Sequence, residues 1–323
     1  MASGRPQHLP WSEWEHFVNY PPTITYMPEK SSRRTAIKQF VAGSAALATG
    51  GVRLNPFSAH QEPAHQVKLK GNINHSVCRW CYESIPLDEF CRSVKEIGLG
   101  AVDLVGPKNW PVLQQYGLYC SMCYTGGENS LTKGWNNLAY HATLIHDFTE
   151  VIPLMAKAGY KDVICFSGNR DGMDDETGWQ NCVKGIHQVL PLAEKSGITV
   201  YMELLNSKID HKDQMCDRSK WGVELCKRIA SPNFKLLYDI YHMQIDEGDV
   251  IRTIRENVAY FGHYHTGGVP GRHEIDDSQE LYYPAIMNAI VETGFKGYVA
   301  QEFIPAASDK IASLRKAIGI CDV

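Results

Sequence analysis

The chain has 323 residues, a formal net charge of −4 and a pI near 6.3. Hydrophobic residues make up 44% and charged residues 21%, a globular composition that excludes a disordered chain, a collagen-like chain and a small disulfide scaffold. The mild acidity argues against a nucleic-acid partner, which usually needs a basic surface. No apolar run reaches the roughly 18 residues of a membrane span, so we expect no stable membrane insertion.

Residues 1–70 are predicted to be a poorly structured extension outside the folded domain. They are rich in Pro, His, Ser and Gly and show no sustained hydrophobic period. From Gly71 onwards a regular period appears. We therefore place a single catalytic domain over residues 71–323.

The sequence predicts an export signal within this extension. Residues 32–40 read SRRTAIKQF, and the weakly apolar stretch VAGSAALAT follows at 41–49. The paired Arg33 and Arg34 before an apolar stretch resemble a twin-arginine signal, although Ala36 stands where Phe is usual. The pattern predicts a periplasmic or other extracytoplasmic protein. The alternative is a basic turn before a short surface helix in a cytoplasmic protein.

The rest of the chain alternates short apolar, β-branched or aromatic runs with amphipathic stretches. Strands are expected at 72–78, 101–105, 119–124, 162–167, 199–205, 235–240, 260–265 and 297–303. Among the helices, 87–97 has apolar residues at the 3.6-residue period, and 137–159 is expected to be the longest. Left-handed residues should end four helices, at Gly98, Gly159, Gly197 and Gly294.

Eight strand–helix units in about 250 residues are typical of a closed (β/α)8 TIM barrel. A doubly wound open sheet also alternates strands and helices, but the count of eight favours the barrel. The chemistry of such a barrel lies at the carboxyl ends of its strands, so reactive residues should gather there.

Each of the last four predicted strands ends with a carboxylate or an imidazole. The residues are Glu203, Asp239, His265 and Glu302. Three carboxylates meeting inside a barrel would be costly to desolvate and would repel one another unless a cation lay between them. We therefore predict one divalent metal ion, with Mn²⁺ or Mg²⁺ favoured by ligand softness and Co²⁺ or Zn²⁺ as alternatives. The competing interpretation is that each residue is satisfied separately by hydrogen bonds.

Two histidines, His263 and His265, share one face of the seventh strand because they are two residues apart. We choose His265 as the ligand because it is nearer the end of the strand. His263 is expected in a lower layer of the barrel or behind the ligands.

At these residues the chain resembles the hydroxypyruvate isomerase family, within the xylose-isomerase-like TIM barrel sugar isomerases and epimerases. The resemblance rests on ELLN at 203–206, DIYHMQ at 239–244 and PGRHE at 270–274, and it covers about residues 72–323. One position differs, because hydroxypyruvate isomerases commonly have Gln where this chain has His265, whereas ketose 3-epimerases have His.

The resemblance implies a role for each matching residue. It implies that the metal is bound by Glu203, Asp239, His265 and Glu302. It implies that the two glutamates are also catalytic and move protons, and that His242 and Arg272 contact substrate oxygens.

The predicted activity is metal-dependent isomerisation or epimerisation of a small sugar or hydroxy-oxo acid through an enediolate intermediate. Proton return to the neighbouring carbon gives isomerisation, and return to the same carbon from the other face gives epimerisation. The main alternative is a metal-dependent lyase or dehydratase acting on a keto-sugar. Two further alternatives are an abasic-site endonuclease and a non-catalytic sugar-binding protein. The expected partner is a small-molecule substrate, and a homo-oligomer is compatible with the sequence.

Two C-x-x-C pairs, Cys78 with Cys81 and Cys120 with Cys123, follow or end early strands. We favour structural or unpaired thiols, with disulfides or a structural zinc as alternatives.

Several further side chains can be interpreted either as substrate-binding residues or as ordinary core or loop residues. Aromatic residues near early strand ends either line a sugar pocket or pack in the core; they are Trp80, Tyr82 and Trp110. Three residues after the fifth strand either bind substrate or, as we favour, form a solvated loop; they are Asn206, Lys208 and His211.

Overall fold

The structure is a computed structural model that describes residues 68–126 and 130–323. Contacts divide the chain into Met1–Pro63 and Ala64–Val323, and every described element belongs to the second unit. The predicted twin-arginine segment and the rest of residues 1–67 lie outside the described residues. Within the described part, no helix combines the length and apolar character needed to cross a membrane.

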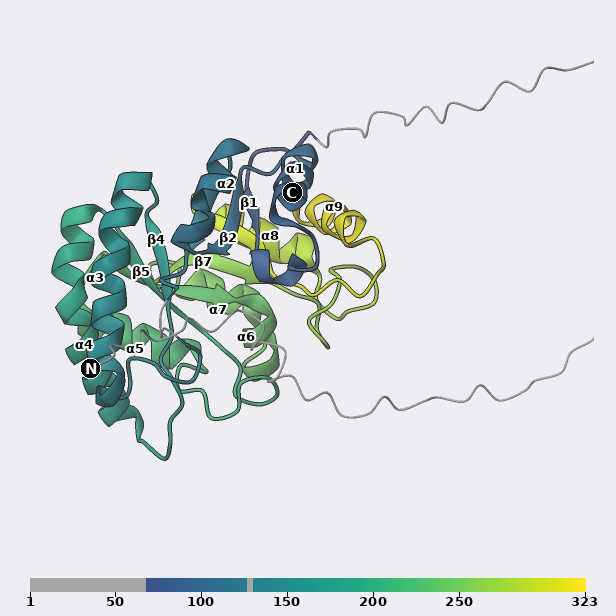
Figure 1. Ribbon diagram of the computed structural model, residues 1–323. Coiled ribbons are helices and arrows are strands. Elements are labelled where there is room, and N and C mark those ends of the chain that lie inside the picture. The colour runs from purple at the N-terminus through teal and green to yellow at the C-terminus, as the bar shows by residue number, and fades with distance from the viewer. Residues whose placement is uncertain (1–67, 127–129) are drawn as a thin grey trace, which may run out of the picture. The chain divides into compact units, whose positions relative to one another are not determined.

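Strands and helices alternate along the described chain (Figure 1). The strands are β1 (Asn74–Val77), β2 (Ala101–Val105), β3 (Tyr119–Cys123), β4 (Asp162–Cys165), β5 (Thr199–Glu203), β6 (Phe234–Asp239), β7 (Phe261–Thr266) and β8 (Tyr298–Gln301). The α-helices are α1 (Leu87–Ile97), α2 (Trp110–Gln115), α3 (His141–Ala158), α4 (Asp175–Ser196), α5 (Ser219–Ile229), α6 (Ile240–Asp246), α7 (Val250–Glu256), α8 (Tyr283–Glu292) and α9 (Lys310–Cys321). Short 3-10 helices occupy Arg79–Tyr82, Pro107–Asn109 and Leu138–Tyr140.

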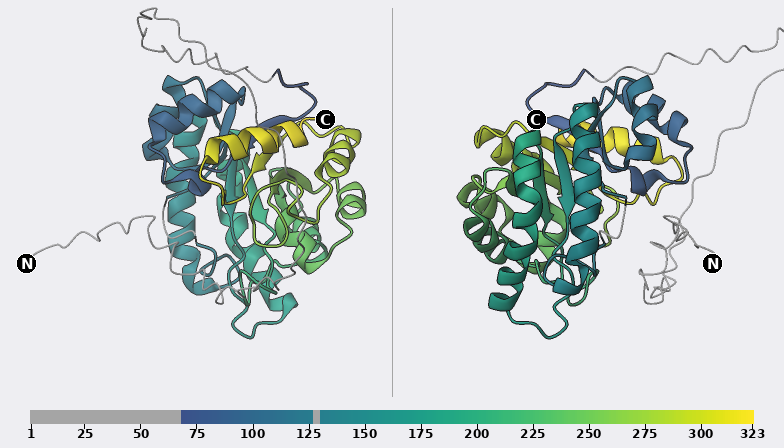
Figure 2. Two further views of the ribbon diagram at one scale, coloured as in Figure 1. Left: turned by 90° about the vertical axis from the view of Figure 1, so that its right-hand side faces the viewer. Right: turned by 60° about the vertical axis from the view of Figure 1, so that its left-hand side comes forward.

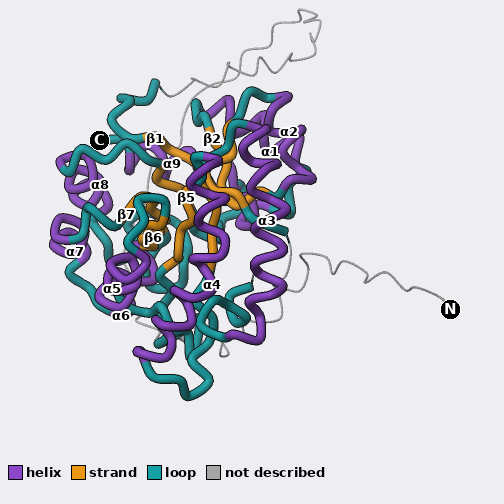
Figure 3. Tube along the Cα trace, turned by 90° about the vertical axis from the view of Figure 1, so that its left-hand side faces the viewer, coloured by secondary structure: helices purple, strands orange, loops and turns teal. Residues whose placement is uncertain are grey.

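The eight strands form one parallel sheet in the order β1-β8-β7-β6-β5-β4-β3-β2. The strands at the two ends of this order, β1 and β2, are joined by a single parallel bridge between Cys78 and Asp103. The sheet is therefore a nearly closed barrel, with helices around it (Figure 3). The predicted TIM barrel is confirmed, and the doubly wound alternative is wrong.

The predicted strands agree with the observed ones to within two residues at each end. The prediction of the longest helix is wrong, because α4 has 22 residues and α3 has 18. The first residues predicted for α3 form the 3-10 turn Leu138–Tyr140 instead. Figure 2 shows α3 and α4 side by side along the barrel.

The interior of α4 contains glycines and a proline, so a sequence pattern does not predict the full length of this helix. Gly178 and Gly185 let this helix approach its neighbours closely, since a Cβ at Gly185 would lie 2.6 Å from Cε3 of Trp135. Pro191 also lies inside the helix. These residue types normally disfavour a helix interior, so packing overrides local propensity here.

The expected helix-ending glycines are confirmed. All four have a positive φ, at Gly98 (102°), Gly159 (80°), Gly197 (65°) and Gly294 (76°). A left-handed residue at this position satisfies the last carbonyls of a helix, and glycine adopts it without strain. These glycines set where several helices turn back towards the next strand.

The packing of α1 gives a test of the core. Phe90 is fully buried, and its ring centroid lies 5.3 Å from that of Tyr82. We expect Phe90→Ala to lower the free energy of unfolding by about 3–5 kcal/mol, because it removes apolar contacts and leaves a cavity. Urea unfolding measures this loss. Arg92→Ala, at an exposed position of the same helix, should change stability by less than about 0.5 kcal/mol. Similar effects of the two variants would contradict this packing.

Candidate functional site

Four side chains from consecutive strands meet at the carboxyl end of the barrel. They are Glu203, Asp239, His265 and Glu302, the four predicted metal ligands. One nitrogen or oxygen from each lies within 4.8 Å of the others, and all four side chains are buried. The sequence therefore identified correctly which residues come together.

Strand register explains why these side chains converge. Glu203 and Asp239 are the last residues of β5 and β6, and Glu302 directly follows β8. Asp239 pairs in register with His265 on β7. Asp239 also caps α6, since its Oδ1 accepts a hydrogen bond from the backbone N–H of His242 at 3.2 Å. The end of β6 thus places a carboxylate and the predicted substrate residue His242 together.

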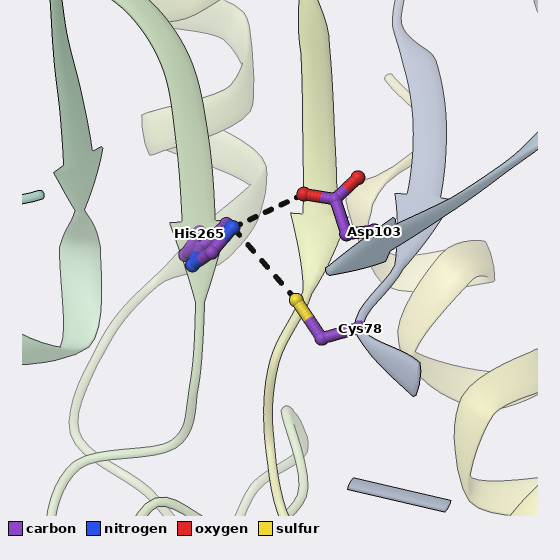
Figure 4. Close-up of side chains that lie close together, drawn as sticks. All are labelled: Cys78, Asp103 and His265. Carbon is purple, nitrogen blue, oxygen red and sulfur yellow. Dashed lines mark hydrogen bonds and ion pairs between the residues drawn. The ribbon is translucent and has the colours of Figure 1, made fainter. Parts of the chain in front are cut away.

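The two ring nitrogens of His265 face different groups. Its Nδ1 lies 2.9 Å from Glu302 Oε2 and 3.3 Å from Glu203 Oε1, inside the cluster. Its Nε2 points the other way, to Asp103 Oδ2 at 3.1 Å and Cys78 Sγ at 3.7 Å (Figure 4). The nitrogen available to a metal among the carboxylates is therefore Nδ1.

Asp103 on β2 contacts two histidines at the site and was not among the predicted site residues. Its Oδ1 accepts hydrogen bonds from the hydroxyls of Ser76 and Ser121, and its Oδ2 faces Nε2 of His263 and of His265. A charge inside the apolar strand AVDLV was the same signal that drew attention to Glu203. The sequence did not reveal which side chains of β2 face the inside of the barrel. The strand does not alternate regularly, because its register shifts around Asp103 and Leu104 has a positive φ of 58°.

Asp103 is held as a carboxylate. Burial by itself raises the pKa of Asp103, but the neighbouring His263 and His265 outweigh this effect and lower it well below its usual value. His263 lies one layer below His265, with its Nε2 2.6 Å from Asp103 Oδ2. The predicted lower-layer position of His263 is thus confirmed.

Arg272 occupies the open side of the carboxylate cluster. Its Nη2 lies 2.5 Å from Glu302 Oε2 and 3.4 Å from Asp239 Oδ2. Its guanidinium also lies over two aromatic rings, 5.1 Å from the ring centroid of Trp80 and 5.3 Å from that of Tyr241. The predicted substrate residue therefore lies beside the predicted metal ligands.

Backbone geometry fixes this arginine. Arg272 has a positive φ of 58°, and its N–H donates to the carbonyl of Gly268 at 2.8 Å. A Cβ at Gly268 would overlap the carbonyl oxygen of Glu274, so only glycine allows the loop after β7 to fold back this closely. The loop conformation thus determines where the guanidinium lies.

The two glutamates have different surroundings. Glu302 Oε1 accepts a hydrogen bond from Trp80 Nε1 at 2.7 Å, while its Oε2 contacts Arg272 and His265. Glu203 Oε1 is buried and makes no well-directed hydrogen bond, but it forms an ion pair with His265 Nδ1 at 3.3 Å. Burial raises the pKa of Glu203, whereas Arg272 and His265 outweigh burial and lower the pKa of Glu302 well below its usual value.

These residues fit a divalent cation. Burial raises the pKa of Asp239 well above its usual value, and the nearby Glu302 and Glu203 add to this, because negative charges are crowded there. A set of carboxylate oxygens and one imidazole suits Mg²⁺ or Mn²⁺, and also the borderline ions. Oε1 of Glu203 makes no well-directed hydrogen bond beyond its ion pair with His265, so it is a candidate ligand atom.

A second group with ligand spacing consists of Cys78, Asp103 and His265. Asp103 already faces four hydrogen-bonding side chains, so its oxygens are satisfied. Burial also raises the pKa of the Cys78 thiol well above its usual value, which disfavours the thiolate that a metal would need. We interpret this group as support behind His265.

The loop after β5 differs from the favoured expectation of a solvated loop. Lys208 is exposed, but Asn206 is fully buried and His211 is half-buried. Asn206 Nδ2 lies 2.6 Å from Nδ1 of His242. The solvated-loop prediction is therefore wrong for Asn206, because the loop turns back and hydrogen-bonds to this residue.

All ten cysteines are buried free thiols, so structural thiols are the interpretation that the structure supports. Cys120 and Cys123 lie 3.5 Å apart between sulfur atoms. Among the early aromatic residues, Tyr82 and Trp110 are buried in the core, whereas Trp80 reaches the site.

The fold and the cluster together define a class: a TIM barrel with an acidic and imidazole site at the carboxyl ends of β5 to β8. The model of the family "Xylose isomerase-like TIM barrel" matches residues 111–318. The chain belongs to this family.

Named relatives agree with this assignment. The chain is 36% identical over 115 residues to 2-oxo-tetronate isomerase of Cupriavidus necator, covering 36% of this chain and 44% of that protein. It is 31% identical over 104 residues to the human protein named "Putative hydroxypyruvate isomerase", covering 32% and 38%. It is 29% identical over 134 residues to D-psicose 3-epimerase of Ruminiclostridium cellulolyticum, covering 40% and 43%. The chain thus spans less than half the length of each of these relatives.

A solved structure supports the fold. The crystal structure of "AP endonuclease, family 2" from Brucella melitensis superposes with a TM-score of 0.67 at 21% identity, covering 75% of this chain and 97% of that one. This likeness concerns the fold alone.

The contact between Asp103 and His265 leads to a prediction about metal affinity. We expect Asp103→Asn to weaken Mn²⁺ binding about 10–100-fold, because His265, the predicted ligand, loses the partner that orients its ring. Electron paramagnetic resonance of free Mn²⁺ measures the affinity.

Asp88→Asn is the control, since Asp88 is exposed in the first turn of α1. Equal losses in both variants, or none in Asp103→Asn, would contradict the supporting role of Asp103.

Proposed function

We propose that the protein is a divalent-metal-dependent isomerase of small hydroxy-oxo acids, working through an enediolate. The observation that carries the proposal is the buried cluster of Glu203, Asp239, His265 and Glu302 at the mouth of the barrel. The relatives named for 2-oxo-tetronate and hydroxypyruvate isomerisation support this substrate class. Epimerisation of a ketose is the second candidate, favoured by the histidine at position 265 and the relative named D-psicose 3-epimerase.

The four cluster residues would hold the metal, which supplies Lewis-acid stabilisation of negative charge on substrate oxygens when it is bound. Mn²⁺ or Mg²⁺ is the proposed ion by ligand type, with Co²⁺ or Zn²⁺ less favoured. Arg272 adds a fixed positive charge at the same place, held between the rings of Trp80 and Tyr241. Both features favour a substrate that carries, or develops, negative charge.

The two glutamates are the proposed proton-transfer groups. Glu203 has fewer polar contacts than Glu302, so it is the group that we propose takes the proton from the carbon next to the carbonyl. Glu302 is held at both oxygens by Trp80, Arg272 and His265, so it has a fixed position. Because the glutamates come from β5 and β8, they can address different faces of the substrate, as epimerisation requires.

The activity can be tested by incubating the protein with Mn²⁺ and a panel of hydroxy-oxo acids and ketoses in D₂O. We expect a hydroxy-oxo acid to exchange with its isomer, with deuterium entering at the carbon that receives the proton, as seen by NMR. Inversion of a ketose at one carbon would favour the epimerase. Loss of water from the substrate would instead indicate a lyase or dehydratase, and no turnover across the panel would count against the proposal.

Glutamine variants test the two glutamates. We expect Glu203→Gln and Glu302→Gln each to reduce kcat about 10²–10⁴-fold, because glutamine cannot accept a proton as a base. Metal should still bind when it is supplied in excess, since glutamine keeps one coordinating oxygen. Glu256→Gln is the control, because this exposed residue at the end of α7 should leave kcat unchanged. A variant that binds metal and turns over normally would remove that glutamate from the mechanism.

We further propose that the protein is exported by the twin-arginine route. Replacing Arg33 and Arg34 with lysine should retain it in the cytoplasm, because the route depends on the arginine pair. Cell fractionation measures the distribution. The control is a variant in which a different pair of arginines, Arg252 and Arg255 on α7, is replaced with lysine. Unchanged export of the Arg33/Arg34 variant would contradict the proposal.

A further inference from the structure

Asn206, which follows β5, is a further polar residue at the site. Its side chain is fully buried directly behind His242, whose ring is also fully buried. The ring nitrogen His242 Nε2 has no hydrogen-bond partner and lies 3.6 Å from Asp239 Oδ2, beside the cluster. A buried polar atom without a partner, aimed into a site, is available to a ligand.

Three contacts fix the orientation of the Asn206 amide. Its Oδ1 accepts hydrogen bonds from the backbone N–H groups of Ile209, at 3.1 Å, and Asp210, at 2.9 Å. Its Nδ2 donates to Asp210 Oδ2 at 2.7 Å. Backbone N–H groups can only donate and a carboxylate only accepts, so a flipped amide would lose all three interactions. The group that faces His242 is therefore the amide NH₂.

The amide orientation then fixes the imidazole. Asn206 Nδ2 lies 2.6 Å from His242 Nδ1, so this nitrogen must accept and cannot carry a proton. In a neutral ring the proton is then on Nε2, which faces the site.

We propose that Asn206 is a positioning residue that holds His242 in the Nε2–H tautomer, so that His242 donates a hydrogen bond to a substrate oxygen. This inference rests on the proposed function for the identity of that oxygen, which belongs to the carbonyl or hydroxyl that gains charge in the enediolate. A neutral donor stabilises such charge without supplying a proton of its own.

The two histidines of the site then have opposite tasks. His265 turns its unprotonated Nδ1 to the carboxylate cluster when metal is bound, and its Nε2 to Asp103. His242 turns its N–H to the same space. The difference comes from the residue behind each ring. The carboxylate of Asp103 accepts a hydrogen bond from His265, whereas the amide NH₂ of Asn206 donates one to His242.

The tautomer can be tested without catalysis, by ¹H–¹⁵N correlation spectra of the histidine rings in the metal-free protein. His242→Gln identifies the resonances of His242. We expect wild-type His242 to carry its proton on Nε2. A proton on Nδ1 overturns the inference, and this result needs no variant at position 206.

Asn206→Asp tests the positioning role. A carboxylate accepts a hydrogen bond, so we expect the His242 proton to move to Nδ1 and kcat to fall about 10²–10³-fold, the usual loss for one such donor. Mn²⁺ affinity should change less than about threefold, since the metal cluster is untouched. An unchanged tautomer in the folded variant overturns the inference.

A double variant and a control complete the design. In the His242→Gln background, Asn206→Asp should cause little further loss of kcat, because no imidazole remains to be oriented. Asn136→Asp is the matched control, since Asn136 is another fully buried asparagine, whose Nδ2 donates to the carbonyl of Asn169. It should leave the His242 resonances unchanged. Full additivity of the two site variants would overturn the positioning role. If the tautomer is as expected but no substrate turns over, the proposed function fails and the assignment of the tautomer stands.

Discussion

Crowding of buried negative charge is the constraint on which the site depends. Glu203, Asp239 and Glu302 lie within a few ångströms of one another and away from solvent, an arrangement that is costly unless positive charge accompanies it. In this structure Arg272 and His265 supply it, with ion-pair distances of 2.5 and 2.9 Å to Glu302. The proposed metal would share that task. The loop after β7, which carries Arg272, is thus as much part of the site as the strand ends.

The barrel and the four converging residues could be predicted because their signals are local. A charged residue at the end of an apolar strand, repeated on four successive strands, needs only the periodicity of the chain and the general location of barrel sites. Likewise, helix-ending glycines act through their own backbone angles. The extent of α4 could not be predicted in this way, because its glycines are tolerated only through contacts with Trp135 and Met215, which are distant in sequence.

The residues behind the site were harder to identify for a similar reason. Asp103 belongs to a strand whose register shifts twice, so counting alternate residues does not reveal that it faces His263 and His265. Asn206 follows β5 in a polar stretch that has the composition of a surface loop. Only the return of the loop, in which the N–H of His211 donates to the carbonyl of Asn206, shows that this side chain is enclosed. The composition of a segment predicts whether it is exposed. The burial of Asp103 and Asn206 depends instead on the three-dimensional path of the chain.

The single bridge between β1 and β2 has a consequence for motion. Two strand pairs of the barrel are joined at a single position each: β3 and β4 at Cys123 and Val163, and β1 and β2 by the pairing of Cys78 with Asp103. Cys78 and Asp103 also touch Nε2 of His265. Local opening of proteins concentrates where backbone hydrogen bonds are few, so the seam between β1 and β2 is one of the two places where local opening of the barrel is expected. Each such fluctuation would release the histidine from its support, which couples the slow dynamics of the barrel wall to the order of the site.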